Sequence, residues 1–226
     1  MLEGLAPGRR WPPGPPPSPA EGGADEVTPA PFVPAAASFA RNAYRVATLL
    51  ASRRVRQPRD RKGLQVRFGD GTHSTVYRET VISGARPTEP AVLVVCFRLR
   101  RVRSAWAHTL FRSESELNTV LFAGFPGLVS KLWLCHDETG RYRGIYQWDG
   151  ERAAVDYVRT LWWALTAVSA RDSIRYEVVP GAHVNCFLAP GERDGAPRRE
   201  PGEWWRPTGV LRPYRPNTAP SQNSRR

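Results

Sequence analysis

The stretch KLWLCHDETGRYRGIYQW, from Lys131 to Trp148, decides the fold of this chain. Two runs rich in aromatic and branched residues flank a short polar centre, HDETGR. Strand-forming runs on either side of such a turn are typical of a β-hairpin, so we expect strands over Leu128–Cys135 and Tyr142–Trp148. Successive side chains of a strand point to opposite faces, and Trp133 therefore points away from the leucines beside it. Both faces of the hairpin are expected to be buried.

Strand and helix patterns alternate around this hairpin. The apolar run AVLVVCF opens a strand predicted over Ala91–Arg100, and SIRYEVVPG predicts a last strand over Ser173–Gly181. Apolar residues at helical spacing predict helices over Ser104–Ala123 and over residues 150–169. The order β, α, β, β, α, β is that of a ferredoxin-like domain. The predicted fold class is therefore α+β, with an antiparallel four-stranded sheet and both helices on one face.

Proline marks the limits of the foldable part. Ten of the 22 prolines lie within residues 1–34, and seven lie within residues 190–220. We expect disordered tails over residues 1–35 and 190–226 because these segments hold few large apolar residues. Residues 63–189 are then the folded domain.

The ends of that domain carry two further elements. Alternating apolar residues from Leu64 and the turn pair Asp70-Gly71 predict a hairpin that precedes the ferredoxin-like pattern. HVNCFL, which begins at His183, is expected to form a short edge segment. Asp149 is expected near the N-cap of the second helix, where a carboxylate suits the helix dipole.

The charge of the chain bears on its partners. The net charge of +12 lies mostly in the tails, since residues 63–189 carry fifteen basic and twelve acidic residues. Arginine-rich tails attract phosphate, but no nucleic-acid-binding motif accompanies them, and we do not expect a nucleic-acid partner. Residues 36–62 predict a basic amphipathic helix, Ala35–Arg56, followed by a linker. We expect this helix to pack on its own domain or on a partner subunit; a membrane surface is the alternative.

Several kinds of chemistry lack their motifs. The three cysteines form no C-x-x-C pair, and the four histidines have no H-x-H or H-x-x-x-H spacing, so we expect no metal. Neither G-x-S-x-G nor a phosphate-binding glycine loop occurs, and no cofactor is expected. The start of the chain has no apolar signal core and Ala91–Phe97 is too short to cross a bilayer. We expect a cytoplasmic protein.

A sheet that is apolar on both faces, with helices for only one of them, requires a second layer. The simplest source of that layer is a second copy of the chain, packed sheet against sheet about a two-fold axis. We therefore expect a homodimer.

The hairpin and the helix after it resemble a known group. The residues GFPGLVSKLWL, GIYQW and ERAAVDYVRTLWWAL are similar to the small monooxygenase-like proteins of the dimeric α+β barrel superfamily, which includes the antibiotic-biosynthesis monooxygenases. The shared pattern is P-G-apolar-x-x-K-apolar-W, a turn, then G-I-Y-x-aromatic, then an acidic first helical turn and a tyrosine. It covers Ala91–Pro180, and the two ends of the chain have no counterpart.

The resemblance implies a homodimer and a site between the sheet and the helices. Superfamily members that lack metal and flavin oxidise quinone-forming aromatic compounds, in which the substrate carbanion itself reduces O₂. On this basis we expect a small hydrophobic or aromatic ligand, while the catalytic residues stay unassigned. The candidate ligand-binding residues are Trp133, Tyr146, Trp148, His108, Asn118, Arg98 and Lys131, the last of which matches the lysine of the superfamily.

Each candidate also has a purely structural interpretation. The aromatic residues suit a core or a dimer interface, and the polar ones suit caps, strand edges or surface ion pairs. Two function classes therefore stay open: a cofactor-independent monooxygenase-like enzyme, and a non-catalytic barrel that binds a ligand or scaffolds a complex.

Overall fold

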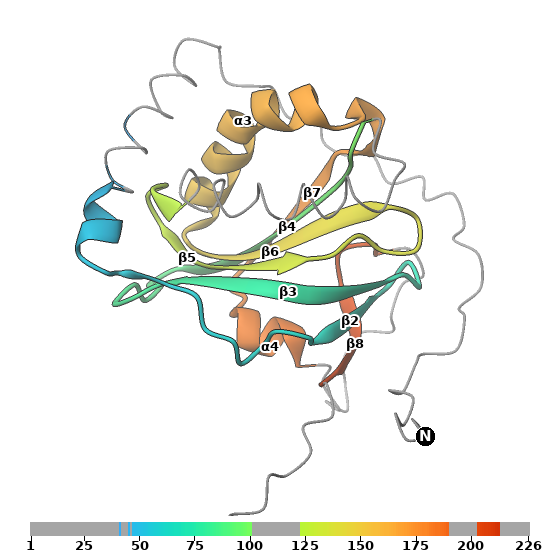
Figure 1. Cartoon of the computed structure of the whole chain (residues 1–226), viewed down its shortest axis with the longest axis horizontal. Helices are drawn as coiled ribbons and strands as arrows, with labels where there is room; N and C mark the ends of the chain where they lie inside the picture. Colours follow the sequence, from blue (N-terminus) through green and yellow to red (C-terminus); the bar gives the residue numbers. More distant parts are fainter. Residues whose placement is uncertain (1–40, 42–44, 46, 101–122, 190–202, 213–226) are drawn as a thin grey trace, which may run out of the picture.

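The computed structural model of the chain describes residues 41, 45, 47–100, 123–189 and 203–212 (Figure 1). The strands are β1 (Val55–Arg56), β2 (Gln65–Phe68), β3 (His73–Ile82), β4 (Pro90–Arg98), β5 (Leu128–Leu134), β6 (Arg141–Asp149), β7 (Arg175–Pro180) and β8 (Pro207–Leu211). The helices are α3 (Glu151–Val168), the short 3₁₀ helix η1 (Arg171–Ser173) and α4 (Val184–Leu188).

All strand pairs in the sheet are antiparallel, and the order across it is β7-β4-β6-β5-β3-β2-β8, with β1 beside β3. Strand β4 lies between β6 and β7, as the split βαβ pattern requires. The protein is thus an α+β protein built on an antiparallel sheet. Of the helix predicted over Ser104–Ala123, residues 104–122 lie outside the described residues, so the complete βαββαβ connection stays a prediction.

Helix α3 covers one face of the sheet (Figure 1). Its buried residues recur at helical spacing: Ala154, Val158, Leu161 and Leu165. They pack against the side chains of β4 and β6 that point toward α3. Asp149 lies next to the N-cap of this helix, as predicted, and the first turn carries the acidic Glu151. The N-cap is Gly150, and the Asp149 carboxylate accepts hydrogen bonds from the backbone N–H groups of Thr88 and Glu89, at 2.7 and 3.0 Å.

The opposite face of the sheet is covered by the chain itself. Strands β2 and β8 curl beneath it together with α4, and Figure 1 shows α3 and α4 on opposite sides. A second core gathers here, with Val66, Ile145 and Leu132 fully buried and Trp204 and Trp205 packed against it. The argument that an uncovered face requires a second copy is therefore wrong, and the homodimer stays a prediction without that support.

Three further expectations are corrected. Residues 190–226 were expected to lack structure throughout, yet Pro207–Leu211 forms strand β8 and pairs with β2. The segment expected at an edge is helix α4. The N-terminal helix ends at Ala51, and Val55–Arg56 pairs with β3 in place of continuing the helix. Among the described residues, no helix is long and apolar enough to cross a membrane.

Candidate functional site

Four side chains from β3, β5 and β6 meet on the face of the sheet that α3 covers. Lys131 lies directly opposite Tyr146 in the β5–β6 pair, and Trp133 lies directly opposite Arg78 in the β3–β5 pair. We call Lys131, Trp133, Tyr146 and Arg78 the Lys131 cluster. The sequence predicted three of its members as candidates, and the strand register brings those three together.

The cluster is stacked around the indole of Trp133. The Lys131 Nζ atom lies 3.2 Å from the centroid of the Trp133 ring and 4.6 Å from that of Tyr146. The Arg78 guanidinium carbon lies 4.3 Å from the Trp133 centroid. The indole N–H donates a 3.2 Å hydrogen bond to the hydroxyl of Thr80. Two basic side chains therefore share one aromatic side chain.

All four members of the cluster are buried: the exposed fraction is 5% for Lys131 and 3% for Tyr146. Burial and the nearby positive charge of Arg78 hold the pKa of the Lys131 amine well below its ordinary value of 10.5. The ring faces of Trp133 and Tyr146 act in the opposite direction, since they favour the ammonium form by about 0.5–2 kcal/mol. Removing an ammonium group from water costs several kcal/mol, so burial outweighs the rings and the pKa of Lys131 stays lowered.

Tyr146 extends the cluster toward helix α3. The Tyr157 hydroxyl donates a 3.3 Å hydrogen bond to the Tyr146 hydroxyl, and the ring of Trp148 lies 4.9 Å from that of Tyr157. Burial raises the pKa of both phenols above the ordinary value of 10, and in Tyr157 it raises the pKa well above that value. The hydrogen bond between them lowers the pKa of Tyr146, but by less than burial raises it. Both hydroxyls therefore stay protonated at neutral pH and can act as hydrogen-bond donors.

Gly144 makes room for this arrangement. A Cβ atom at Gly144 would lie 2.8 Å from Cε2 of Tyr146 and 3.1 Å from its hydroxyl oxygen. The phenol ring lies back along its own strand over the glycine, which is the residue opposite Trp133. The close contact of Tyr146 with its neighbours thus depends on the missing side chain.

The other candidates lie elsewhere. Trp148 is fully buried and stacks on Tyr146 with the ring centroids 6.5 Å apart, so it borders the cluster. Arg98 is exposed and its guanidinium lies 3.9 Å from the carboxylate of Asp172. It is five residues along β4 from Leu93, the partner of Tyr146, which places it about 17 Å away. His108 and Asn118 lie outside the described residues.

Sequence reasoning missed Arg78 and Tyr157. The register of β3 shifts between Val76 and Arg78, so the simple alternation that predicts Arg78 on the far face fails there. Tyr157 continues the helical spacing of Ala154 and Leu161, which was the available signal for its burial.

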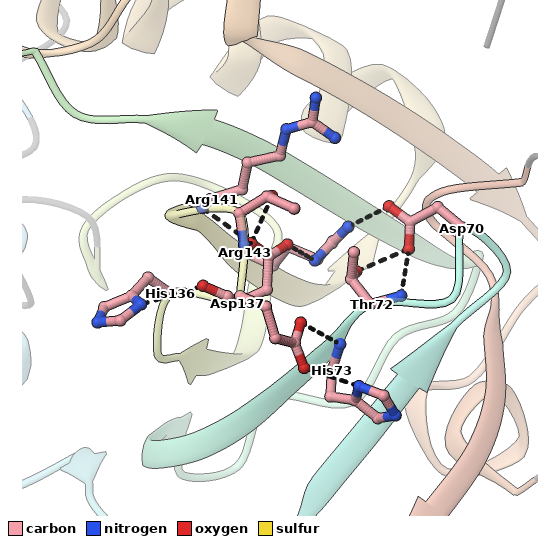
Figure 2. Close-up of polar contacts among 9 residues, drawn as sticks. Asp70, Thr72, His73, His136, Asp137, Arg141 and Arg143 are labelled. Atoms are coloured by element: carbon pink, nitrogen blue, oxygen red, sulfur yellow. Dashed lines mark hydrogen bonds and ion pairs between the residues drawn. The ribbon is translucent and has the colours of Figure 1, made fainter. Parts of the chain in front are cut away.

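A second buried polar group joins two hairpin turns on the opposite face (Figure 2). The Arg143 side chain is fully buried and donates 2.6 Å hydrogen bonds to both Asp70 and Asp137. Its guanidinium carbon lies 4.3 Å from the centroid of Phe68. The other oxygen of each carboxylate accepts hydrogen bonds from its own turn, including those from the backbone N–H groups of Thr72 and Thr139. We call Arg143, Asp70 and Asp137 the Arg143 network. Both terminal nitrogens of the guanidinium and all four carboxylate oxygens have hydrogen-bond partners, while the buried Nε of Arg143 has none within the described residues; the paired charges fit a structural role.

In the described part of the chain, no group of three or more histidine, cysteine or acidic side chains could hold a metal ion.

Comparison with known proteins gives structural neighbours alone. No family model matches the chain. No curated protein matches it either.

Three solved structures are similar to part of the chain. An uncharacterised ferredoxin-fold protein related to antibiotic biosynthesis monooxygenases, from Listeria monocytogenes, is 18% identical with a TM-score of 0.38 over 50% of this chain and 66% of its own. A monooxygenase-like protein from Listeria innocua is 18% identical, with a TM-score of 0.36 over 48% and 63%. An anthrone oxidase-like protein is 11% identical, with a TM-score of 0.33 over 50% and 55%.

The chain thus spans less than two thirds of each of these structures. The description of the first structure names the antibiotic biosynthesis monooxygenases, which belong to the group that the hairpin and helix residues resemble. At these identities and TM-scores the likeness decides nothing about activity.

Proposed function

We propose that the Lys131 cluster binds a small aromatic or hydrophobic molecule and oxidises it with O₂, without a cofactor. The observation that carries this proposal is the buried amine of Lys131, held against the rings of Trp133 and Tyr146. A lysine that is removed from water and lies beside another cation is a more effective general base at neutral pH than an exposed lysine, because a larger fraction of it is unprotonated.

The proposed reaction begins with proton transfer. The neutral Lys131 amine takes a proton from an acidic C–H group of an electron-rich aromatic substrate, which leaves a carbanion. The ammonium formed in this step faces the Trp133 and Tyr146 rings, whose negative faces stabilise it more than they stabilise the neutral amine. The rings thus favour the charge that develops during the reaction, which is the condition for catalysis.

The carbanion then reduces O₂. In the net reaction, a CH₂ group and O₂ give a carbonyl group and water: the carbon loses four electrons, one oxygen atom enters the product, and the other leaves as water. The Tyr146 hydroxyl, which keeps its own proton, is suited to donate a hydrogen bond to the oxygen that gains negative charge. Trp148 and Tyr157 exclude water from this side of the cluster.

Oxygen consumption tests this proposal, with anthrone as the probe and a metal chelator present. The wild-type protein should accelerate O₂ uptake above the rate in buffer, and Lys131→Met should lose that acceleration. Lys62→Met is the matched control because Lys62, the other lysine of the chain, is exposed. A wild-type rate equal to that of buffer, or equal rates for wild type and Lys131→Met, would contradict the proposed activity.

Full burial of the neighbouring aromatic residues favours a second candidate function, a non-catalytic barrel. Trp148 and Tyr157 are 0% and 1% exposed and pack against each other, as residues of a filled core do. In that case Lys131→Met would change stability alone, and neither variant would alter O₂ uptake.

A further inference from the structure

Three arginines lie together at one end of the sheet. Arg98 ends β4 and Arg141 begins β6, and the two are directly opposite each other in the β4–β6 pair. Arg175 begins β7 and is opposite Cys96, two residues before Arg98, in the β4–β7 pair. Side chains alternate between the two faces of a strand, so all three share the face on which Arg143 lies. We call Arg98, Arg141 and Arg175 the arginine triad.

The strand register keeps the members of the triad close to one another. In an antiparallel pair, directly opposite residues have Cβ atoms about 4.5–5.5 Å apart, and diagonal neighbours are about 7–8 Å apart. Arg98 and Arg141 are an opposite pair, and Arg98 and Arg175 are diagonal neighbours. Arginine side chains are long enough to converge over these distances, so three guanidinium groups from three adjacent strands can reach one small ion.

The protein itself provides little negative charge for the triad. Arg141 and Arg175 are half-buried, and among the described residues no carboxylate lies within ion-pair distance of either guanidinium. Arg98 has the 3.9 Å contact with Asp172, whose carboxylate is 79% exposed. Like charges directly opposite each other destabilise a sheet, so the pairing of Arg98 with Arg141 carries a cost that the described side chains do not offset.

The acidic residues of the turn before β6 are bound elsewhere. Both carboxylate oxygens of Asp137 accept hydrogen bonds, and the only one of these from Arg141 comes from its backbone N–H group, at 3.0 Å. The two carboxylate oxygens of Glu138 contact the backbone N–H and the Nδ1 atom of His73. Figure 2 shows the Arg141 side chain extending away from this group of bonds. Its guanidinium therefore stays available to a ligand.

We propose that the arginine triad binds a phosphate group. A guanidinium can donate two parallel hydrogen bonds to phosphate oxygens, and guanidinium groups from three strands can share the oxygens of one tetrahedral group. The bound anion would attract both Arg98 and Arg141 and so offset their mutual repulsion. The triad lies on the face opposite the Lys131 cluster, so this inference goes beyond the proposed oxidation and does not depend on it.

Isothermal titration calorimetry of the full chain tests the site. The probes are inorganic phosphate and phenyl phosphate, with the ionic strength held constant by sodium chloride because other arginines of the chain also attract anions. Arg141→Gln and Arg175→Gln each remove one guanidinium of the triad. Arg152→Gln is the matched control, since Arg152 is an exposed arginine of α3 and this variant has the same net charge as the other two.

We expect wild type and Arg152→Gln to bind at least one probe with equal affinity, and each triad variant to bind it about tenfold more weakly or worse. The probe that binds more tightly then shows whether the site takes free phosphate or a phosphate monoester. Equal affinities in all four proteins would overturn the inference, because the phosphate would then bind other arginines. Failure of wild type to bind either probe would overturn it as well.

Thermal unfolding separates binding from folding in these variants. The bound probe should raise the Tm of wild type and of Arg152→Gln, because it stabilises the folded state alone. Without a probe, Arg141→Gln should unfold at no lower temperature than wild type, since the change removes a like-charge pair. If Arg141→Gln does not fold, the pairing of Arg98 with Arg141 carries no such cost and the inference loses its basis. A probe that raises the Tm of Arg175→Gln as much as that of wild type would overturn it too.

Discussion

The guanidinium of Arg143 and the carboxylate of Asp137 are joined by a 2.6 Å hydrogen bond, and neither side chain is exposed to solvent. Arg143 belongs to strand β6, and Asp137 belongs to the turn that leads into it. The second bond of Arg143 reaches Asp70, in the turn between β2 and β3, so one side chain fixes two hairpin turns relative to each other (Figure 2).

Asp137→Asn should therefore destabilise the fold. The change removes one of the two negative charges that compensate a buried guanidinium, and breaking a buried ion pair costs about 3–5 kcal/mol. Denaturant unfolding measures the loss. Asp172→Asn, at the exposed and longer contact with Arg98, is the control and should change the free energy of unfolding by less than about 1 kcal/mol. Equal effects of the two changes would contradict the structural role of the Arg143 network.

The free energy of unfolding of Glu79→Gln, relative to that of wild type, should be higher at neutral pH than at acidic pH. Burial raises the pKa of Glu79 above its ordinary value of 4.5, and the ion pair with Arg61 opposes this effect without cancelling it. Because the folded-state pKa is the higher one, the folded state favours the protonated acid, and that stabilisation is lost as pH rises through the folded pKa. Glutamine is neutral at every pH, so its advantage over wild type should grow from pH 4.5 upward. Unfolding free energies of both proteins across that range test the sign, and an advantage that shrinks would contradict it.

Gly144→Ala should disturb the Lys131 cluster. The new methyl group would overlap the Tyr146 ring, which must move away from Gly144 or force its strand to shift. Overpacking of this kind costs about 1–3 kcal/mol. Near-ultraviolet circular dichroism and denaturant unfolding report the movement and its cost. If the Gly144→Ala variant has wild-type stability and an unchanged aromatic spectrum, the Tyr146 ring does not lie over residue 144.

Lys131→Met should change how stability depends on pH. The pKa of Lys131 is lowered in the folded state, so the unfolded chain binds more protons between the folded pKa and 10.5. Wild-type stability should therefore rise with pH through that window relative to Lys131→Met, which cannot titrate. Urea unfolding of both proteins at several pH values measures the difference. A constant difference across the window would mean that Lys131 has the same pKa in both states.

The sequence predicts the part of the fold that follows local periodicity. Strands β4, β5, β6 and β7 and helix α3 form where their alternating or helical patterns indicate, because burial on one or both faces selects those patterns. Strand β8 was not predictable in this way. PTGVL has no strand pattern of its own, and its pairing with β2 arises from contacts between residues far apart in the sequence.

The sequence likewise predicts some residues of the candidate site and not others. Lys131, Trp133 and Tyr146 fall on one face by alternation along a single hairpin, so the sequence could bring them together. Arg78 joins them only because the β3 register shifts, and no local pattern marks that shift. The sequence did not predict the Arg143 network for a related reason. The turn patterns predict Asp70 and Asp137 as turn residues, which they are, but give no sign that the second carboxylate oxygen of each accepts a hydrogen bond from Arg143.

The charge of the Lys131 amine is the central claim, and NMR titration of the chain with ¹³C-labelled lysine tests it most directly. The chain contains two lysines, so the spectrum holds two ε-carbon resonances, and the exposed Lys62 serves as the internal reference. The structure predicts that the Lys131 resonance titrates well below pH 10.5 and disappears in Lys131→Met. A Lys131 resonance that titrates at or above pH 10.5 would contradict the neutral amine, and with it the base that the proposed oxidation requires.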